Sequence, residues 1–106
     1  MYGRIGSLIA APGQRDEVAR VILDGMRDMP GCLSYVVAAD AGDANTLWIT
    51  EAWTDRDAHR AALQRPAVQE AMRLGRPLIQ GMGDTTETEP IGGHGLGEPD
   101  RGTRET

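Results

Sequence analysis

The apolar positions change their spacing several times along the chain, and each change predicts an element. Tyr2 to Ala10 mix β-branched and small residues and stop at the turn signal Pro12-Gly13, which predicts a strand. From Gln14 to Met29 the spacing is helical, which predicts an amphipathic helix. Its apolar positions are Val18, Ile22, Met26 and Met29. Pro30-Gly31 ends this helix, because proline cannot continue the hydrogen-bond ladder.

Two strands joined by a short polar turn are predicted next. Cys32 to Ala39 is almost continuously apolar, which indicates that both of its faces are covered. Asp40 to Asn45 is typical of a turn between antiparallel strands. Thr46 to Trp53 has the composition of a strand. Its alternation places one set of side chains on one face, Leu47, Ile49, Glu51 and Trp53, and the other set on the opposite face, Trp48, Thr50 and Ala52.

The next part of the chain is predicted to be helical and then to return to the sheet. Thr54 fits the N-cap of a helix that runs to about Gln64. A second, shorter helix is predicted over Ala67 to Leu74, after a proline that suits its first turn. The glycines that follow leave at best a helical turn over Leu78 to Met82. Thr85 to Glu89 has the composition of a strand.

The predicted order is β-α-β-β-α-(α)-β, which indicates an α+β fold. A four-stranded antiparallel sheet with helices on one face, the ferredoxin-like arrangement, satisfies this order with short connections. Such a sheet leaves its second face bare, whereas the strand from Cys32 to Ala39 is apolar on both faces. We therefore expect a second copy to cover that face in a homodimer. Residues 1–90 would form this domain, and residues 91–106 a Gly- and Pro-rich tail that is flexible or laid on the partner subunit.

Composition narrows the classes of protein further. The chain has 106 residues, enough for one domain, and a formal charge of -5, which argues against nucleic acid or an anionic membrane as a partner. It has no signal-peptide pattern and no membrane-spanning run, so we expect a soluble, cytoplasmic protein. Cys32, the only cysteine, is predicted to be a small buried strand residue rather than a reactive thiol. His94 is expected to be exposed, and no metal site is predicted.

Four groups of residues carry a resemblance to a known family. They are Pro12-Gly13, Pro30-Gly31-Cys32-Leu33-Ser34-Tyr35, Glu51-Ala52-Trp53 and the helix that contains Ala58-His59. Together they resemble the antibiotic biosynthesis monooxygenase superfamily, small dimeric α+β barrel proteins that include quinol monooxygenases. The resemblance covers Tyr2 to Pro90, and the tail sequence ETEPIGGHGL is similar to that of actinobacterial, quinol monooxygenase-like members. It implies a homodimer that oxidises a small hydroquinone-like or polycyclic aromatic substrate with O₂ and without a cofactor.

The resemblance also suggests where a substrate would bind. In the aromatic-polyketide oxygenases of the superfamily, a strand Trp matches Trp53, and an Asn four residues earlier is replaced here by Ile49. A pocket Tyr of that group falls at His59 and an Arg at Arg73. The match is partial, so the mechanism has to be argued from the residues that are present.

An oxygenase that works without metal or flavin needs a substrate that reduces O₂ itself, such as a hydroquinone, an anthrone or a catechol. The protein must then supply a base, a donor or cation for the developing oxyanion, and a dry, aromatic-lined pocket. His59 is the best candidate for the base, and its place near the start of a helix favours the neutral imidazole. The alternative is a structural histidine at the rim of the core.

Four further residues are candidates, and each has a structural alternative. Trp53 could stack on an aromatic ring or simply fill the core. Glu51 shares its face, and a buried carboxylate there needs a partner, for which Arg73 or Arg4 is available. Arg73 could bind an oxyanion or be an ordinary charge near a helix end. Tyr35 could donate a hydrogen bond to substrate or pack on the sheet.

The sequence therefore suggests three functions. The first is the cofactor-independent monooxygenase, with His59 and Arg73 catalytic and Trp53, Glu51 and Tyr35 binding substrate. The second is a non-catalytic small-molecule-binding or structural dimer of the same fold. The third, a haem binder, is disfavoured, because the Trp and the haem-ligating His of haem-degrading relatives are replaced here by Ala62 and Met72. Many quinol monooxygenase relatives have a His at the position that Ala62 occupies in this chain, so this chain lacks that histidine.

Overall fold

A computed structural model describes residues 1–96 of the chain. In this part of the chain, the elements are β1 (Tyr2–Ala10), α1 (Arg15–Gly25), β2 (Cys32–Ala39), β3 (Thr46–Trp53), α2 (Arg56–Ala62), α3 (Pro66–Gly75), a 3₁₀ turn η1 (Arg76–Leu78) and β4 (Ile79–Thr88). The order agrees with the predicted one.

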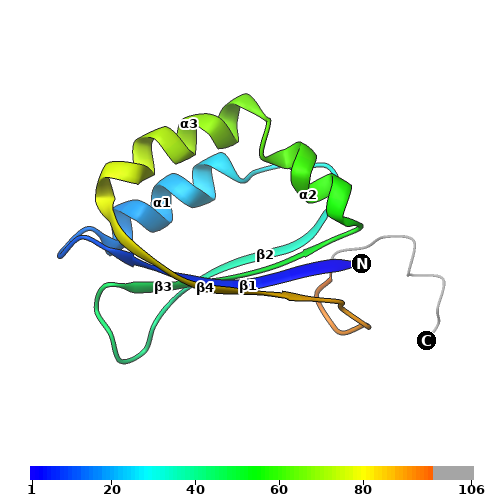
Figure 1. Cartoon of the computed structure of the whole chain (residues 1–106), viewed down its shortest axis with the longest axis horizontal. Helices are drawn as coiled ribbons and strands as arrows, with labels where there is room; N and C mark the ends of the chain where they lie inside the picture. Colours follow the sequence, from blue (N-terminus) through cyan, green and yellow to red (C-terminus); the bar gives the residue numbers. More distant parts are fainter. Residues whose placement is uncertain (97–106) are drawn as a thin grey trace.

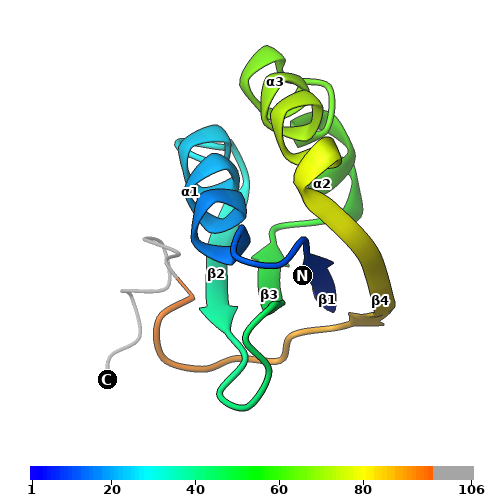
Figure 2. The same cartoon turned by 90° about the vertical axis from the view of Figure 1, so that its left-hand side faces the viewer.

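The strands form one antiparallel sheet in the order β2-β3-β1-β4, and the three α-helices lie on the same face of it (Figures 1 and 2). This is the ferredoxin-like arrangement, and the α+β prediction is confirmed. The first and third strands of the chain are central neighbours, so Tyr2 lies opposite Trp53 and Arg4 opposite Glu51. Arg4 also lies opposite Glu87 of β4. This register brings residues from both ends of the chain to one end of the sheet.

The core between sheet and helices has two clusters of buried side chains. One gathers at the end of the sheet where β3 stops and consists of Tyr2, Met29, Trp53, Ala62 and Val68. The other lies at the opposite end of the sheet and consists of Leu8, Ala10, Val18 and Leu47. Trp53 is 1% exposed, so it is part of the core, as the structural alternative for this residue expects, and its role in substrate binding stays a prediction. Half-buried Met26 and Tyr35 pack against the first cluster.

Three predicted boundaries need correction. The first helix ends at Gly25 instead of Met29, and Asp28 beyond it has a positive φ of 51°, which an α-helix does not accommodate. The N-cap of α2 is Asp55 instead of Thr54, because the Asp55 side chain accepts a hydrogen bond from the Ala58 amide at 2.7 Å. The last strand begins at Ile79, so residues 79–82 are extended where a helical turn was expected.

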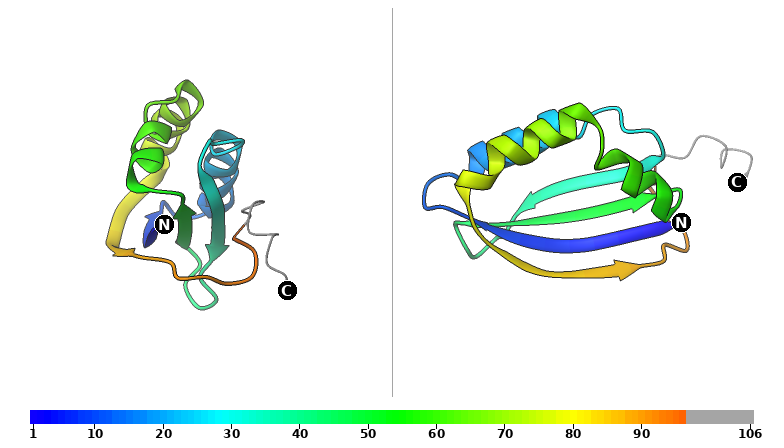
Figure 3. Two further views of the ribbon diagram at one scale, coloured as in Figure 1. Left: turned by 90° about the vertical axis from the view of Figure 1, so that its right-hand side faces the viewer. Right: turned by 45° about the horizontal axis from the view of Figure 1, so that its top comes forward.

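The sheet face away from the helices carries exposed apolar side chains, as the sequence predicts. They include Ile5, Ile9, Val36 and Trp48, which are 40%, 44%, 52% and 42% exposed. After β4 the chain crosses beneath β3 and β2 on this side (Figures 2 and 3), and Pro90 lies against Gly3. We call this face the open face. Its covering by a second copy stays a prediction.

The predicted Gly- and Pro-rich tail is described as far as residue 96. His94 is exposed, as expected, and Ile91 is 97% exposed. Residues 97–106 lie outside the described residues. The packing of the tail on a partner subunit stays a prediction. Among the described helices, none is long and apolar enough to cross a membrane.

Candidate functional site

His59 lies on α2, with its ring turned toward the end of the sheet. Its side chain is 13% exposed. The ring centroid is 5.5 Å from that of Tyr2 and 5.4 Å from that of Trp53, and the Trp53 contact is edge-to-face. Asp55 caps the helix, and Ala62, one turn beyond Ala58, is buried against the sheet. The capped helix thus fixes the imidazole above the aromatic pair.

Glu51 connects the sheet to this histidine. Its Oε1 accepts a hydrogen bond from Trp53 Nε1–H at 2.9 Å and lies 3.9 Å from His59 Nε2. Its Oε2 lies 3.9 Å from Arg4 Nε, so Arg4 is the partner that the sequence left open. Burial raises the pKa of the Glu51 carboxyl, while the Trp53 hydrogen bond and Arg4 oppose that shift. The carboxylate therefore has a donor, a cation and an imidazole around it.

A second set of polar groups closes the site on its exposed side. Tyr2 OH donates to Glu87 Oε2 at 2.8 Å and accepts from Arg4 at 3.1 Å. Arg56 pairs with Glu87 at 2.9 Å, and its guanidinium lies 4.6 Å from the Tyr2 ring centroid. The hydrogen bonds from Arg56 and Tyr2 lower the pKa of Glu87 to about 2. Tyr2 and Glu87 are thus held in place beside His59.

The surroundings of His59 favour the neutral imidazole. Burial lowers its pKa below the ordinary 6.5, and Arg4 and Arg56 lower it further, while Glu87 acts in the opposite direction. The sequence led us to expect the same direction, with the helix dipole as the cause. The leading physical causes are instead burial and two arginines. A neutral imidazole near pH 7 has a free ring nitrogen that can accept a proton.

A small cavity of about 50 Å³ lies inside this cluster. Its lining comprises Met26, Met29, Tyr35, Glu51, Trp53, His59, Ala62, Leu63 and Val68. Four of the five predicted site residues therefore meet at one cavity. Burial, reinforced by Glu51, strongly raises the pKa of Tyr35, so its phenol stays protonated and can donate a hydrogen bond. We call this space the inner cavity.

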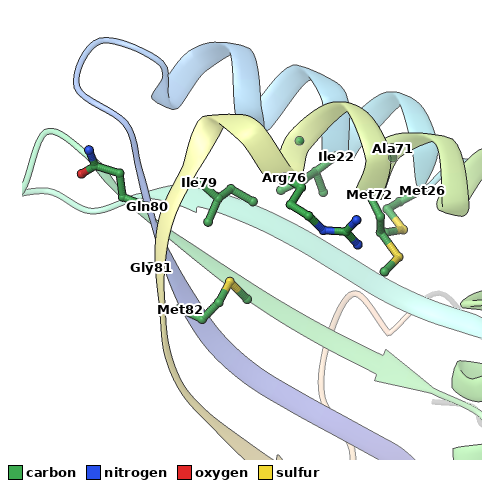
Figure 4. A pocket seen from close by; sticks show the side chains of 10 residues that line it. Ile22, Met26, Ala71, Met72, Arg76, Ile79, Gln80, Gly81 and Met82 are labelled. Atoms are coloured by element: carbon green, nitrogen blue, oxygen red, sulfur yellow. The ribbon is translucent and has the colours of Figure 1, made fainter.

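A larger groove opens between α1, α3 and the start of β4 (Figure 4). It has a volume of about 450 Å³. The residues that line it are Ile22, Met26, Ala71, Met72, Gly75, Arg76, Ile79, Gln80, Gly81 and Met82. Most of these side chains are apolar. We call this space the apolar groove.

Arg73, the fifth predicted site residue, is not brought to this cluster. Its guanidinium pairs with Glu70 at 2.6 Å on the outer side of α3, with 68% of the side chain exposed. It lines neither the inner cavity nor the apolar groove. Its exposed pairing fits the alternative of an ordinary charge near a helix end.

Sequence reasoning missed Tyr2, Arg56 and Glu87, and named Arg4 only as a possible partner. Tyr2 and Arg4 alternate onto the same face of β1, which was visible in the sequence. What was not visible is the register that sets them opposite Trp53 and Glu51. Within residues 1–96, no group of three or more His, Cys, Asp or Glu side chains is arranged to hold a metal ion.

Comparison with known proteins agrees with this architecture. Residues 1–74 match the family model described as antibiotic biosynthesis monooxygenase. The crystal structure of a candidate antibiotic biosynthesis monooxygenase from Chloroflexus aurantiacus is 50% identical, with a TM-score of 0.88 over 91% of this chain and 98% of that one. A similar candidate from Deinococcus radiodurans is 24% identical, with a TM-score of 0.73 over 88% and 95%. A Pseudomonas aeruginosa protein is 21% identical, with a TM-score of 0.74 over 86% and 94%. No curated protein matches the chain.

Proposed function

Since the chain belongs to the antibiotic biosynthesis monooxygenase family, we propose that it oxidises a small hydroquinone-like or polycyclic aromatic molecule with O₂ and without a cofactor. One observation carries this proposal. His59, whose pKa is lowered by burial, faces a cavity that it shares with Glu51, Trp53 and Tyr35. A base, an anion that can stabilise its protonated form, an aromatic wall and a hydrogen-bond donor thus surround one space.

The reaction balances with the substrate as the only reductant. His59 takes a proton from a phenolic O–H or from an acidic C–H, and the resulting anion passes one electron to O₂. The substrate radical and superoxide combine to a peroxide anion, which takes the proton back from His59 to become a hydroperoxide, and the hydroperoxide loses water to leave a quinone. One oxygen atom of O₂ enters the product and the other leaves in water.

The charged groups around His59 have matching roles in this scheme. Arg4 and Arg56 disfavour the cationic imidazole before substrate binds, so His59 is neutral and able to accept a proton. Glu51 Oε1, 3.9 Å from His59 Nε2, can stabilise the imidazolium once the proton has moved. The Tyr35 phenol donates to the developing oxyanion of the substrate, taking the role that the sequence had suggested for Arg73.

The second candidate is a binding or structural dimer of the same fold that carries out no reaction. The size of the inner cavity favours it, because about 50 Å³ does not hold an aromatic ring in this conformation. Under this alternative, His59 is a structural histidine that joins Tyr2, Trp53 and Glu51 at the rim of the core.

Oxygen uptake separates the two candidates. The purified protein is assayed with naphthohydroquinols, catechols and anthrones against the rate of spontaneous autoxidation. The monooxygenase requires an excess rate on at least one class, with the hydroxylated or quinone product formed in proportion to O₂ consumed. The absence of any excess across the panel would favour the binding dimer.

A further inference from the structure

The inner cavity and the apolar groove have one lining residue in common, and that residue is Met26. We propose that Met26 is a gate between them, and that the ligand has two parts: an aromatic head for the inner cavity and an apolar extension for the groove. This inference rests on the proposed function for the identity of the head. It adds the gate, the second subsite and the shape of the ligand.

The volumes require such a gate if a ring is to reach His59. A benzene-sized ligand needs a cavity of roughly 150 Å³. The inner cavity, at about 50 Å³, is too small for it, and the apolar groove, at about 450 Å³, is large enough. For a ring in the groove to reach Glu51 and His59, the two spaces therefore have to join. Met26 lines both spaces, so it is the side chain whose movement would join them.

The position of Met26 suits a movable side chain on a fixed backbone. It is the C-cap of α1, and its amide donates to Ile22 O at 3.0 Å. The preceding Gly25 is buried against Ala71 of α3, where the helices come so close that a Cβ on Gly25 would clash. The Met26 side chain itself is only half-buried, and an unbranched thioether changes rotamer readily. Figure 4 shows it beside Met72 at the groove.

The two linings define the class of ligand. The inner cavity presents Glu51, His59 and Tyr35, which suit a hydroxyl or carbonyl oxygen on a ring. Around the groove, polar side chains come only from Arg76 and Gln80, and the rest of the lining is apolar or glycine. An oxidisable phenolic ring that carries an alkyl or fused-ring extension fits both spaces. A small, fully polar hydroquinone would leave the groove unfilled.

The methionines provide reporters for a binding experiment without turnover. Of these two spaces, Met72 and Met82 line only the groove, Met29 lines only the inner cavity, and exposed Met1 lines neither. The protein is labelled with ¹³C at the methionine methyl groups and titrated with 2,3-dimethyl-1,4-naphthoquinone. Both carbons of its quinone double bond carry methyl groups, which blocks the positions where the Cys32 thiol would substitute, and the probe is already oxidised. We expect the methyl signals of Met72, Met82 and Met29 to shift together, and that of Met1 to stay.

Two variants test the gate itself. Met26→Ala removes the barrier and should lower the apparent Kd read at Met29 by about tenfold, the factor expected if one molecule in ten is open at rest. Met26→Ile places a β-branched, stiffer side chain there and should abolish the Met29 shift while Met72 and Met82 still respond. Leu23→Ala, at an exposed position of the same helix, should leave all shifts unchanged. Amide spectra establish that each variant is folded.

The outcomes are distinguishable from those of the oxygen-uptake assay. Groove signals that shift without Met29, in both the unmodified protein and Met26→Ala, would overturn the gate. So would a Met29 response that Met26→Ile leaves intact, or a probe that shifts no methionine. If the Met29 response depends on Met26 but the protein consumes no oxygen, the gate is supported and the proposed reaction is wrong.

Discussion

Among single residues, His59 is the proposed base, and charges of both signs act on its imidazole. Burial, Arg4 and Arg56 lower its pKa, and Glu87 raises it. Removing one of these charges should therefore change the pKa in a known direction. The pKa of an imidazole is measured directly by NMR titration.

We expect the imidazole of His59 to titrate below 6.5 in the unmodified protein. In Arg56→Gln it should titrate at higher pH, because one repelling cation is lost while the Glu87 carboxylate remains. Arg20→Gln, which changes an exposed arginine on α1 that pairs with Glu17, is the matched control and should leave the value unchanged. A His59 pKa that falls in Arg56→Gln would contradict this electrostatic description.

Glu51 has a structural task in addition to its place beside His59, because its Oε1 accepts the hydrogen bond of the buried Trp53 indole. Glu51→Ala would leave that N–H unsatisfied, at a cost of about 1–3 kcal/mol in the free energy of unfolding. Glu51→Gln keeps an amide oxygen as acceptor and should lose less. Urea denaturation measures both. Equal losses would mean that the Trp53 bond does not contribute to stability.

At the scale of elements, local sequence located the strands and helices well and their ends less well. Thr54 and Asp55 are both favourable N-cap residues, so the sequence alone does not distinguish them. In the structure Thr54 belongs to the loop before α2, because its amide donates a hydrogen bond to Gly31 O at 2.8 Å. Similarly, Gly81 and Gly83 look like breakers, yet they lie in β4. A Cβ on Gly83 would meet the Ser7 hydroxyl, at the point where the pairing with β1 shifts register, so Ser7 would have to change rotamer to admit it.

The two possible caps of α2 give a matched test. Asp55→Ala removes the side-chain acceptor of the Ala58 amide and should cost about 1 kcal/mol of stability. Thr54→Ala should cost clearly less, since Asp55 and its hydrogen bond remain. Thermal and urea unfolding of the two variants provide the comparison. A larger loss in Thr54→Ala would restore Thr54 as the residue that fixes the start of this helix.

The candidate site could be predicted only in part, for a related reason. Glu51 and Trp53 follow from alternation within one strand, and His59 from its helix. Arg4, Tyr2 and Glu87 reach the site through the pairing of β1 with β3 and β4, and a single sequence does not reveal that register. Arg73 is predicted by the resemblance and as a possible partner of Glu51, whereas on α3 it pairs with Glu70 and is exposed.

For the molecule as a whole, the open face is the surface where a single chain leaves apolar side chains exposed to solvent. Exposed Ile5 and Val36 lie on either side of Thr50 in paired strands, with Trp48 one row further along the sheet. Exposed apolar side chains gathered in this way are typical of an interface between proteins. A second copy packed sheet against sheet would bury them, and the homodimer remains our prediction.

Sedimentation should show a dimer at micromolar concentration. Ile5→Glu, in the middle of the open face, should shift the protein toward monomer, because two copies related by a two-fold axis would each bury the new charge. Leu23→Glu, at an exposed position of α1 that is 48% exposed, should leave the dimer intact. A monomer in the unmodified protein, or equal effects of the two substitutions, would overturn this interface.

If His59 is the base of a cofactor-independent oxidation, oxygen uptake should depend on its imidazole, and the His59→Ala variant measures that dependence. General-base catalysis contributes about 10²–10⁴-fold, so the excess over autoxidation should fall by at least about a hundredfold. His94→Ala, at the exposed second histidine of the chain, is the control and should retain the full rate. An excess rate that survives in folded His59→Ala would show that His59 is not the base.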